Sequence, residues 1–500
     1  MSAFSKRKEL IIIILVFGFF IFTMVHGLMH SPLWGDEWFE YYCSQSEILS
    51  GRMNETINYT FQPPLYNYVM HLWLMISTDH TWFRMFNIFI GVGSGAFLLG
   101  TVSRLCDRET SLVSLVALAC CYEWVYCTQE CSEYALMVFC LFAALFFYVR
   151  SVESFSYPDL AGFILSCVGA IYSQYGSVFI VAPLLIIFYF SYILTDRIKT
   201  KQKLILTLAY LLSAVSFALP LWLFFLRHQM ANQELSDNTV KLSLHLCKGI
   251  FVTLGRVIGY LFSLNIQGGW ETFWGLFTIV LFVFSLILIF DKRIKWTGSS
   301  LIICMWTGYF IHYFLVRMQI YGMIHPGESA GFYYRYSYFY IPIVFTVLPM
   351  MIRELLIWDR SRNYRGFLYA TVGIGALCMF LSLYSLMGNW EKSLDDKYAM
   401  IWSDHKGWED TTYLFGAAHY GFDYYLQALG YDETYRDDSI IEPDADATDL
   451  PDSFWMWRSN WGQQNWTKMM DKATMLGYDI EIYDDSGDAG QLAYCTLNQP

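Results

Sequence analysis

Charge is scarce in this sequence. Only 15% of the 500 residues are Asp, Glu, Lys or Arg, whereas 56% are hydrophobic and 19% are aromatic. A soluble globular chain carries roughly 25% charged residues, so the composition excludes a protein that is water-soluble throughout. This abundance of apolar residues also excludes a disordered chain, and the lack of a glycine repeat excludes collagen.

Several motifs are missing as well. The chain has no P-loop, no nucleotide-binding glycine motif and no HExxH pair, which leaves nucleotide-driven and zinc-protease functions without support. None of its 12 cysteines forms a CxxC pair that would mark a zinc site. The sequence identifies no cofactor and gives no sign of a nucleic-acid partner.

The few charges are unevenly distributed. Residues 389–500 contain 22 acidic and 7 basic residues, a net charge of −15, whereas residues 1–388 contain 22 acidic and 25 basic residues, a net charge of +3. The sequence therefore predicts a membrane body over 1–388 and an acidic, water-soluble domain over 389–500.

Apolar runs of about 20 residues, the length that crosses a bilayer, recur along the body. They predict eleven transmembrane helices, at 10–28, 82–104, 110–127, 134–150, 158–173, 176–195, 204–226, 272–290, 298–317, 334–352 and 366–388. A further stretch, 249–264, contains Arg256. We interpret it as re-entrant or interfacial, because counting it as a span would move the basic loop 291–295 outside.

Basic residues near the span ends predict the orientation. Lys6, Arg7 and Lys8 precede the first span and place the N-terminus in the cytoplasm. Every other loop on that side then carries lysine or arginine. The chain is thus predicted to be a multi-pass protein of the cell membrane whose C-terminal domain is extracytoplasmic.

The acidic domain shows a mixed α/β pattern. Strands are predicted at 411–417, 453–459 and 478–485, and helices at 419–430 and 465–477, each helix ending at a glycine. Three strands and two helices make a small layered α/β domain.

The first outer loop, 29–81, begins with an acidic pair. Asp36 and Glu37 stand among Trp34, Trp38 and Tyr41. One interpretation is a solvated acidic turn beside an interfacial aromatic belt. The other is a carboxylate that aromatic packing holds near the membrane, as a catalytic base requires.

The same loop continues with Pro63 and Pro64, which predict an extended entry into a short helix. This helix carries apolar residues on one face: Leu65, Tyr68, Leu72 and Met75. Because it is too short to span, we expect it to lie along the membrane interface.

Arginines gather on the predicted outer side, namely Arg84, Arg227, Arg256, Arg317 and Arg335. Each alone is explained by snorkelling to lipid headgroups. Together they also suit a phosphate, because the guanidinium fork matches phosphate geometry. Glu130 and Glu133 lie in a short outer turn and are expected to face the same cavity as Asp36. This combination suggests chemistry on a lipid-linked phosphate.

Over roughly residues 1–350, the motifs resemble those of GT-C superfamily integral-membrane glycosyltransferases, in the branch similar to protein O-mannosyltransferases and aminoarabinose transferases. The segments that carry the resemblance are GDEWFEYY, QPPLYNYVMHLWL, TWFRMFN, QECSEYAL, YSQYGSVF and FYYRYSYFYIP. The resemblance implies a polyprenyl-phosphate sugar as donor and a hydroxyl of a protein, lipid or glycan as acceptor, with inversion at the anomeric carbon.

The resemblance also implies roles for individual residues. Asp36 is assigned as the catalytic base. Acceptor or sugar positioning falls to Glu37, Glu130, Glu133 and Tyr134; donor-phosphate binding to Arg335 with Arg84 or Arg256; and the loop motif consists of Gln62, Pro63, Pro64 and Tyr66. The carboxylates would also suit a divalent cation, so the sequence leaves metal dependence open.

Three positions depart from the family pattern. Gln62 stands where relatives often have histidine or lysine, Ser132 replaces a frequent arginine, and Gln174 replaces a frequent histidine. These changes bear on donor and acceptor recognition, so the resemblance predicts the reaction class better than the substrate.

Two other functions compete with the enzyme. A transporter or flippase of a lipid-linked sugar would also need a polar path, but it is expected to show internal repeats and charges near the bilayer midplane. No repeat is apparent, and the charges lie at one face. A non-catalytic scaffold whose acidic domain binds a partner is the third interpretation.

Overall fold

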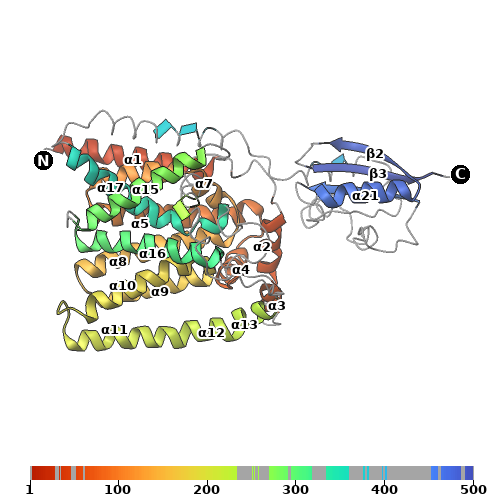
Figure 1. Cartoon of the computed structure of the whole chain (residues 1–500). Coiled ribbons are helices and arrows are strands. Elements are labelled where there is room, and N and C mark those ends of the chain that lie inside the picture. Colours follow the sequence, from red (N-terminus) through yellow and green to blue (C-terminus); the bar gives the residue numbers. More distant parts are fainter. Residues whose placement is uncertain are drawn as a thin grey trace. The chain divides into compact units, whose positions relative to one another are not determined.

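The computed structural model describes most of residues 3–359 and part of the C-terminal region (Figure 1). The described residues are 3–26, 28, 33, 35–46, 52–59, 62–232, 250–251, 253, 257, 270–290, 294–317, 334–359, 376–377, 380–381, 384, 397, 400–401, 452–459, 463–485 and 490–498. The chain divides into two compact units. The first comprises Met1–His26 with Cys43–Gly388, and the second Gly27–Tyr42 with Asn389–Pro500.

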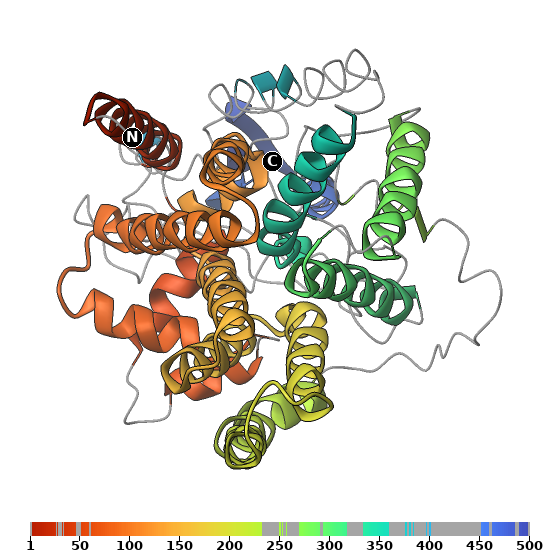
Figure 2. The same cartoon turned by 90° about the vertical axis from the view of Figure 1, so that its left-hand side faces the viewer.

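The first unit is a bundle of apolar helices that run alongside one another, seen from the side in Figure 1 and end-on in Figure 2. They are α1 (Ala3–Val25), α5 (His80–Leu105), α6 (Arg108–Ala119), α7 (Tyr122–Gln129), α8 (Glu133–Glu153), α9 (Tyr157–Ser173), α10 (Val178–Ile193), α11 (Thr200–Ser213), α12 (Leu219–Leu221), α13 (Arg227–Asn232), α15 (Trp270–Phe290), α16 (Trp296–Arg317) and α17 (Tyr340–Asp359). A helix satisfies its own backbone hydrogen bonds, which lipid cannot do. The predicted polytopic helical body is confirmed.

Most predicted spans coincide with helices. Among the described residues, six helices are long and apolar enough to cross a membrane, or seven if the bent pair α6 and α7 counts as one span. Shorter apolar helices occupy Leu10–Val25 and Gly275–Phe290. The stretches 249–264 and 366–388 lie largely outside the described residues, so the count of eleven spans stays a prediction.

The span predicted at 110–127 coincides with two helices, α6 and α7, and its counting as one span stays a prediction. α6 ends at Ala119 and α7 begins at Tyr122, and the two helices are bent by 65°. Cys120 and Cys121 at the junction give no sign of this break, because sharp kinks usually coincide with proline or glycine. The helix after the bend, α7, ends at Gln129, and the predicted site residue Glu130 is its C-cap.

Close helix packing around α16 depends on a glycine. A Cβ atom added at Gly308 would lie 2.2 Å from the backbone oxygen of Phe179 in α10. Backbone cannot yield as a flexible side chain does, so only glycine permits this approach of α16 to α10.

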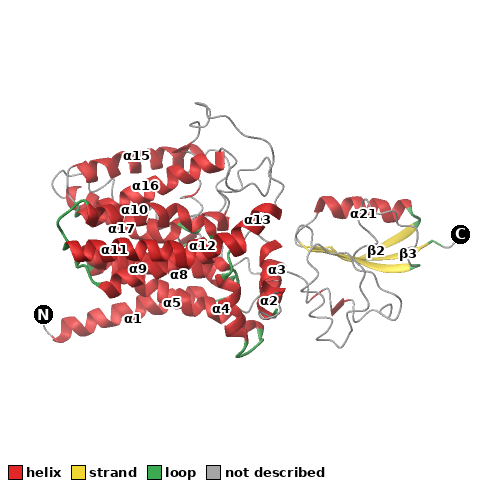
Figure 3. Cartoon of the chain, turned by 90° about the horizontal axis from the view of Figure 1, so that it is seen from below, coloured by secondary structure: helices red, strands yellow, loops and turns green. Residues whose placement is uncertain are grey.

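Three short helices precede α5: α2 (Gly35–Gln45), α3 (Arg52–Tyr59) and α4 (Leu65–Leu74). α3 and α4 lie at the end of the bundle opposite the N-terminus of α1 (Figures 1 and 3). The helix predicted after the two prolines is confirmed as α4. Of the residues predicted on its apolar face, Leu72 and Met75 are 64% and 73% exposed, whereas Leu65 and Tyr68 are half-buried. Its place along the membrane interface stays a prediction.

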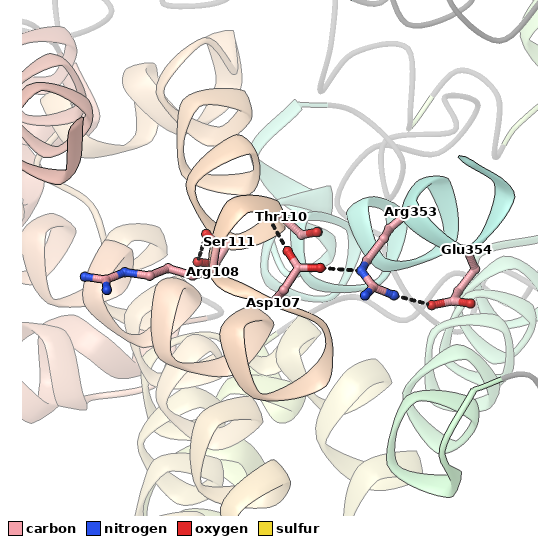
Figure 4. A network of polar contacts seen from close by, with 6 residues as sticks. All are labelled: Asp107, Arg108, Thr110, Ser111, Arg353 and Glu354. Atoms are coloured by element: carbon pink, nitrogen blue, oxygen red, sulfur yellow. Dashed lines mark hydrogen bonds and ion pairs between the residues drawn. The ribbon is translucent and has the colours of Figure 1, made fainter. Parts of the chain in front are cut away.

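At the opposite end of the bundle, Asp107 joins α6 to α17 (Figure 4). Its carboxylate caps α6 by accepting a hydrogen bond from the Thr110 amide at 2.8 Å and also accepts one from Nε of Arg353. Arg353 in turn donates to Glu354 at 2.7 Å. Partial burial acts to raise the pKa of Asp107, but the Thr110 amide and the Arg353 guanidinium outweigh it and lower that pKa below its usual value.

We expect Asp107→Asn to destabilise the body by about 0.5–1 kcal/mol, since the half-exposed ion pair is lost while asparagine still caps the helix. Asp107→Ala, the matched variant, also loses the cap and should cost about 1 kcal/mol more. Because the folded pKa is lowered, the Asp107 contribution is present at neutral pH and disappears as pH falls through that pKa. Thermal unfolding in detergent between pH 7 and pH 3 checks this. The melting temperature of Asp107→Asn should fall less steeply with decreasing pH than that of the wild type. The same dependence of melting temperature on pH in wild type and variant would contradict this.

The C-terminal part of the second unit contains a small antiparallel sheet packed on one helix. β1 (Ser453–Ser459), α21 (Gln463–Met475), β2 (Tyr478–Asp485) and β3 (Gly490–Leu497) follow in sequence, and the strand order is β1-β3-β2. The core between sheet and helix includes Phe454, Met456, Trp466 and Met469.

These elements confirm the strands predicted at 453–459 and 478–485 and the helix predicted at 465–477. The helix ends before Gly477, whose φ of 92° lies in the left-handed region that favours glycine. The central strand β3 was not predicted. The elements predicted at 411–417 and 419–430 lie outside the described residues, and the outer location of this domain stays a prediction.

Candidate functional site

The predicted acidic pair begins a helix. Asp36 and Glu37 occupy the first turn of α2, where the positive end of the helix dipole favours carboxylates. Asp36 is half-buried, whereas Glu37 is fully buried. Trp38 is buried too, and its ring packs against Tyr41 and Tyr42 at centroid distances of 5.7 Å. A solvated turn therefore does not describe Glu37, which is buried, and the role of the acidic pair stays a prediction.

Glu130 and Arg335, predicted separately, lie together. Arg335 belongs to η6 (Tyr334–Ser337), a single 3-10 turn that precedes α17. Its Nη1 is 3.6 Å from Oε1 of Glu130, and the side chains are 22% and 1% exposed. The Arg335 guanidinium also lies 5.8 Å from the ring centroid of Tyr336. A nearly buried carboxylate thus faces an arginine that solvent still reaches.

This contact lies at the same end of the bundle as the C-terminus of α1. Gln129, the last residue of α7, donates a 2.7 Å hydrogen bond to the backbone oxygen of His26, just beyond α1. Arg353, by contrast, lies near the other end of α17, beside the start of α6. The carboxylate and Arg335 are therefore at the end predicted to face outward.

Two further predicted residues open α8. Glu133 and Tyr134 are its first residues, and both are buried, at 3% and 5% exposure. The Tyr134 ring packs edge-to-face against Tyr336 at 6.5 Å and Tyr338 at 5.6 Å. α7, α8 and the η6 turn thus meet around one aromatic cluster.

Glu123 is a buried carboxylate near the candidate site that the sequence reasoning missed. It is 4% exposed, and its Oε2 accepts a 2.7 Å hydrogen bond from the hydroxyl of Tyr338. A signal was present, because an acidic residue inside an apolar run of spanning length is a functional-site hypothesis by default. Glu123 lies inside the span predicted at 110–127 and was not selected there.

The other predicted arginines differ in position. Arg84 of α5 is 5% exposed and lies three residues before Asn87, on the same helix face. The Asn87 side-chain amide donates a hydrogen bond to the backbone oxygen of Glu130, which brings this face of α5 to the acidic turn. Arg227 is exposed, and Arg256 lies outside the described residues.

The loop motif is held by one buried amide. Gln229 of α13 is 1% exposed. Its Nε2 donates to the backbone oxygens of Ile57 at 3.1 Å and Gln62 at 2.6 Å, and its Oε1 accepts from the Tyr175 hydroxyl at 2.8 Å. The loop then passes through Pro63 and Pro64, both buried, to Tyr66, which is fully buried in α4. Gln229 therefore joins α3, the loop and the turn after α9.

We expect Gln229→Leu to loosen this loop, because three buried polar groups lose their partner at a cost of about 1–3 kcal/mol. Limited proteolysis should then cut near residues 60–64 faster than in wild type. Gln229→Glu is the matched variant: it keeps the acceptor for Tyr175 but not the donor for the two carbonyls, and it should give an intermediate rate. Unchanged cleavage in both variants would contradict the proposed anchoring.

Two buried hydroxyls adjoin the site residues. Ser132 is the N-cap residue of α8, and Ser337 ends η6; neither Oγ atom has a hydrogen-bond partner within the described part of the chain. Buried polar groups are almost always satisfied, so these hydroxyls are suited to polar atoms of a ligand or to water. Among the described residues, no group of three or more His, Cys, Asp or Glu side chains could hold a metal ion.

Residues 61–223 match the family model described as dolichyl-phosphate-mannose-protein mannosyltransferase. The fold resembles ArnT from Cupriavidus metallidurans in the apo state (TM-score 0.56, 10% identity, 98% of each chain covered). It also resembles the same protein bound to undecaprenyl phosphate (TM-score 0.54, 10% identity, 99% of this chain and 98% of that chain). An oligosaccharyltransferase from Archaeoglobus fulgidus matches with a TM-score of 0.49, 11% identity and coverage of 98% and 74%. A search of the curated proteins found no match.

The matched region includes the QPPLY loop, Arg84, Glu130 and Glu133. The similarity to ArnT extends over almost the whole of both chains. The resemblance seen in the sequence is therefore confirmed: the fold is similar to that of ArnT over almost the whole of both chains, and residues 61–223 match the family model described as dolichyl-phosphate-mannose-protein mannosyltransferase.

Proposed function

We propose that the chain transfers a sugar from a polyprenyl-phosphate donor to an acceptor hydroxyl at the outer face of the cell membrane, with inversion of the anomeric carbon. The observation that carries this proposal is the contact between Glu130 and Arg335 at one end of a GT-C bundle. A guanidinium group matches phosphate geometry and a carboxylate accepts hydrogen bonds from hydroxyls, so this pair suits a ligand that has both a phosphate and sugar hydroxyls. One ArnT structure with this fold is bound to undecaprenyl phosphate.

In the proposed reaction, one residue accepts the proton of the acceptor hydroxyl and others stabilise the leaving phosphate. Asp36 accepts the proton of the acceptor hydroxyl while that oxygen forms a bond to the anomeric carbon. The bond from this carbon to the phosphate oxygen breaks, and the electron pair leaves with the polyprenyl phosphate. Arg335, with Arg84 or Arg256, stabilises the charge that develops on this phosphate, which a partly desolvated arginine does well.

The remaining site residues bind hydroxyl groups. Glu130 and Glu133 are buried carboxylates at the turn between α7 and α8, and ionised carboxylates accept hydrogen bonds from sugar or acceptor hydroxyls. Tyr134 and Glu37 serve the same purpose. The acceptor itself is a protein, a lipid or a cell-surface glycan.

Membrane fractions supplied with a radiolabelled polyprenyl-phosphate sugar test the proposal. Transfer of label to an acceptor supports the enzyme. Movement of the intact lipid across the membrane without bond cleavage would instead indicate the flippase. The absence of both transfer and movement would indicate the scaffold. Repeating the assay with a chelator and with added divalent cations decides metal dependence. Analysing which glycan disappears when the gene is deleted identifies the sugar and the acceptor.

A further inference from the structure

α7 is joined at two points to the segment formed by the η6 turn and the residue that follows it, Tyr338. At the C-terminal end of α7, Glu130 faces Arg335 at 3.6 Å. In its first turn, Glu123 accepts the 2.7 Å hydrogen bond from the Tyr338 hydroxyl. Both carboxylates are at most 4% exposed, and Tyr338 is 1% exposed. The second contact involves neither a predicted site residue nor a group used in the proposed reaction.

Tyr338 lies where it can control the position of Arg335. Its backbone N–H donates to the backbone oxygen of Arg335 at 3.2 Å, and its own backbone oxygen accepts from the Ile341 amide at 2.9 Å. Tyr338 therefore links the η6 turn to the first turn of α17. Its ring also packs against Tyr134. The Tyr338 side chain is therefore oriented by this ring contact and by the hydrogen bond to the Glu123 carboxyl group.

From these contacts we infer that the Glu123–Tyr338 hydrogen bond is a positioning device that holds Arg335 in place for the donor phosphate. The inference rests on the proposed role of Arg335. Tyr338 and the Glu123 carboxyl group are both buried, and a hydrogen bond is electrostatically stronger inside a protein than in water. The Glu123–Tyr338 hydrogen bond fixes the turn from the first turn of α7, and Glu130 faces the Arg335 guanidinium from the C-terminal end of the same helix.

Four single variants of the full chain test the inference. Tyr338→Phe removes the hydroxyl but keeps the ring, and Glu123→Leu removes the acceptor. Glu123→Gln is the conservative variant, since its amide oxygen still accepts the hydrogen bond. Tyr340→Phe is the matched control: it removes an equally buried hydroxyl from the same part of the chain, but that hydroxyl contacts His312 of α16 at 2.8 Å.

The readouts are binding of undecaprenyl phosphate and the kinetic constants for a labelled polyprenyl-phosphate sugar. Tyr338→Phe and Glu123→Leu should weaken lipid-phosphate binding about tenfold and raise the donor KM, with the acceptor KM unchanged. Glu123→Gln and Tyr340→Phe should stay within about twofold of wild type. A merely structural role would instead change the amount of folded protein and both KM values together.

A double variant separates the possible failures. If Tyr338 acts through Arg335, Tyr338→Phe added to Arg335→Ala should cause no further loss, and fully additive losses would overturn the inference. Normal binding in Tyr338→Phe, with impaired binding in Arg335→Ala, would overturn the positioning role alone. Normal binding in Arg335→Ala would remove that arginine from the phosphate site, so the proposed assignment and the inference would fail together.

Discussion

Asp36→Asn is expected to reduce sugar transfer by about 10²–10⁴-fold, the range that general-base catalysis contributes. Asparagine is nearly the same size as aspartate but cannot accept the proton of the acceptor hydroxyl. Binding of the donor lipid should change little, because the variant alters proton transfer rather than phosphate recognition. The loss should therefore appear in kcat measured with a labelled polyprenyl-phosphate sugar, with the donor KM close to wild type.

The fold should survive this change. Asp36 is only half-buried in the first turn of α2, and losing one carboxylate at a helix N-terminus costs about 0.3–1 kcal/mol. Asp79→Asn is a suitable control, because Asp79 is an exposed carboxylate that caps α5 and asparagine caps equally well. Near-normal turnover in Asp36→Asn would remove Asp36 from the mechanism, whereas a similar loss in Asp79→Asn would point to a general effect of charge.

The helices of the body were predictable because the bilayer allows few alternatives. An apolar run of spanning length must be helical in lipid, and α5 (His80–Leu105) accordingly extends the predicted 82–104 by only a few residues. The short α4 followed from its two prolines and its apolar spacing. Where the chain bends inside an apolar run, as between α6 and α7, no residue type signals it, and packing in the folded protein decides the geometry.

The missed strand β3 has a similar explanation. Its buried residues include Leu492, Ala493 and Cys495, which are neither β-branched nor aromatic and so give a weak local preference for a strand. Its position comes from pairing with β1 on one side and β2 on the other. Such cross-strand pairing is set by distant segments and is not visible in the strand itself.

The candidate site was predictable residue by residue but not as an arrangement. Glu130 and Arg335 were each identified by their place at the outer end of a span, yet their contact depends on the bend before α7 and on the η6 turn. Glu123 shows the converse. An acidic residue inside an apolar run was visible in the sequence, but its hydrogen bond with the Tyr338 hydroxyl was not.

Arg335→Ala should lower the rate of sugar transfer by about 10²–10³-fold, comparable with the loss of one preorganised electrostatic donor. Arg335→Lys keeps the charge but not the planar fork that matches a phosphate, so its loss should be intermediate. Arg104→Ala is the matched control, because Arg104 forms an exposed ion pair with Glu153 at 3.2 Å near the start of α6, at the other end of the bundle. It should retain nearly full activity, since exposed pairs contribute little. If Arg335→Ala transferred sugar at the rate of Arg104→Ala, the stabilisation of the leaving phosphate would have to come from another cation, with Arg84 the first to test.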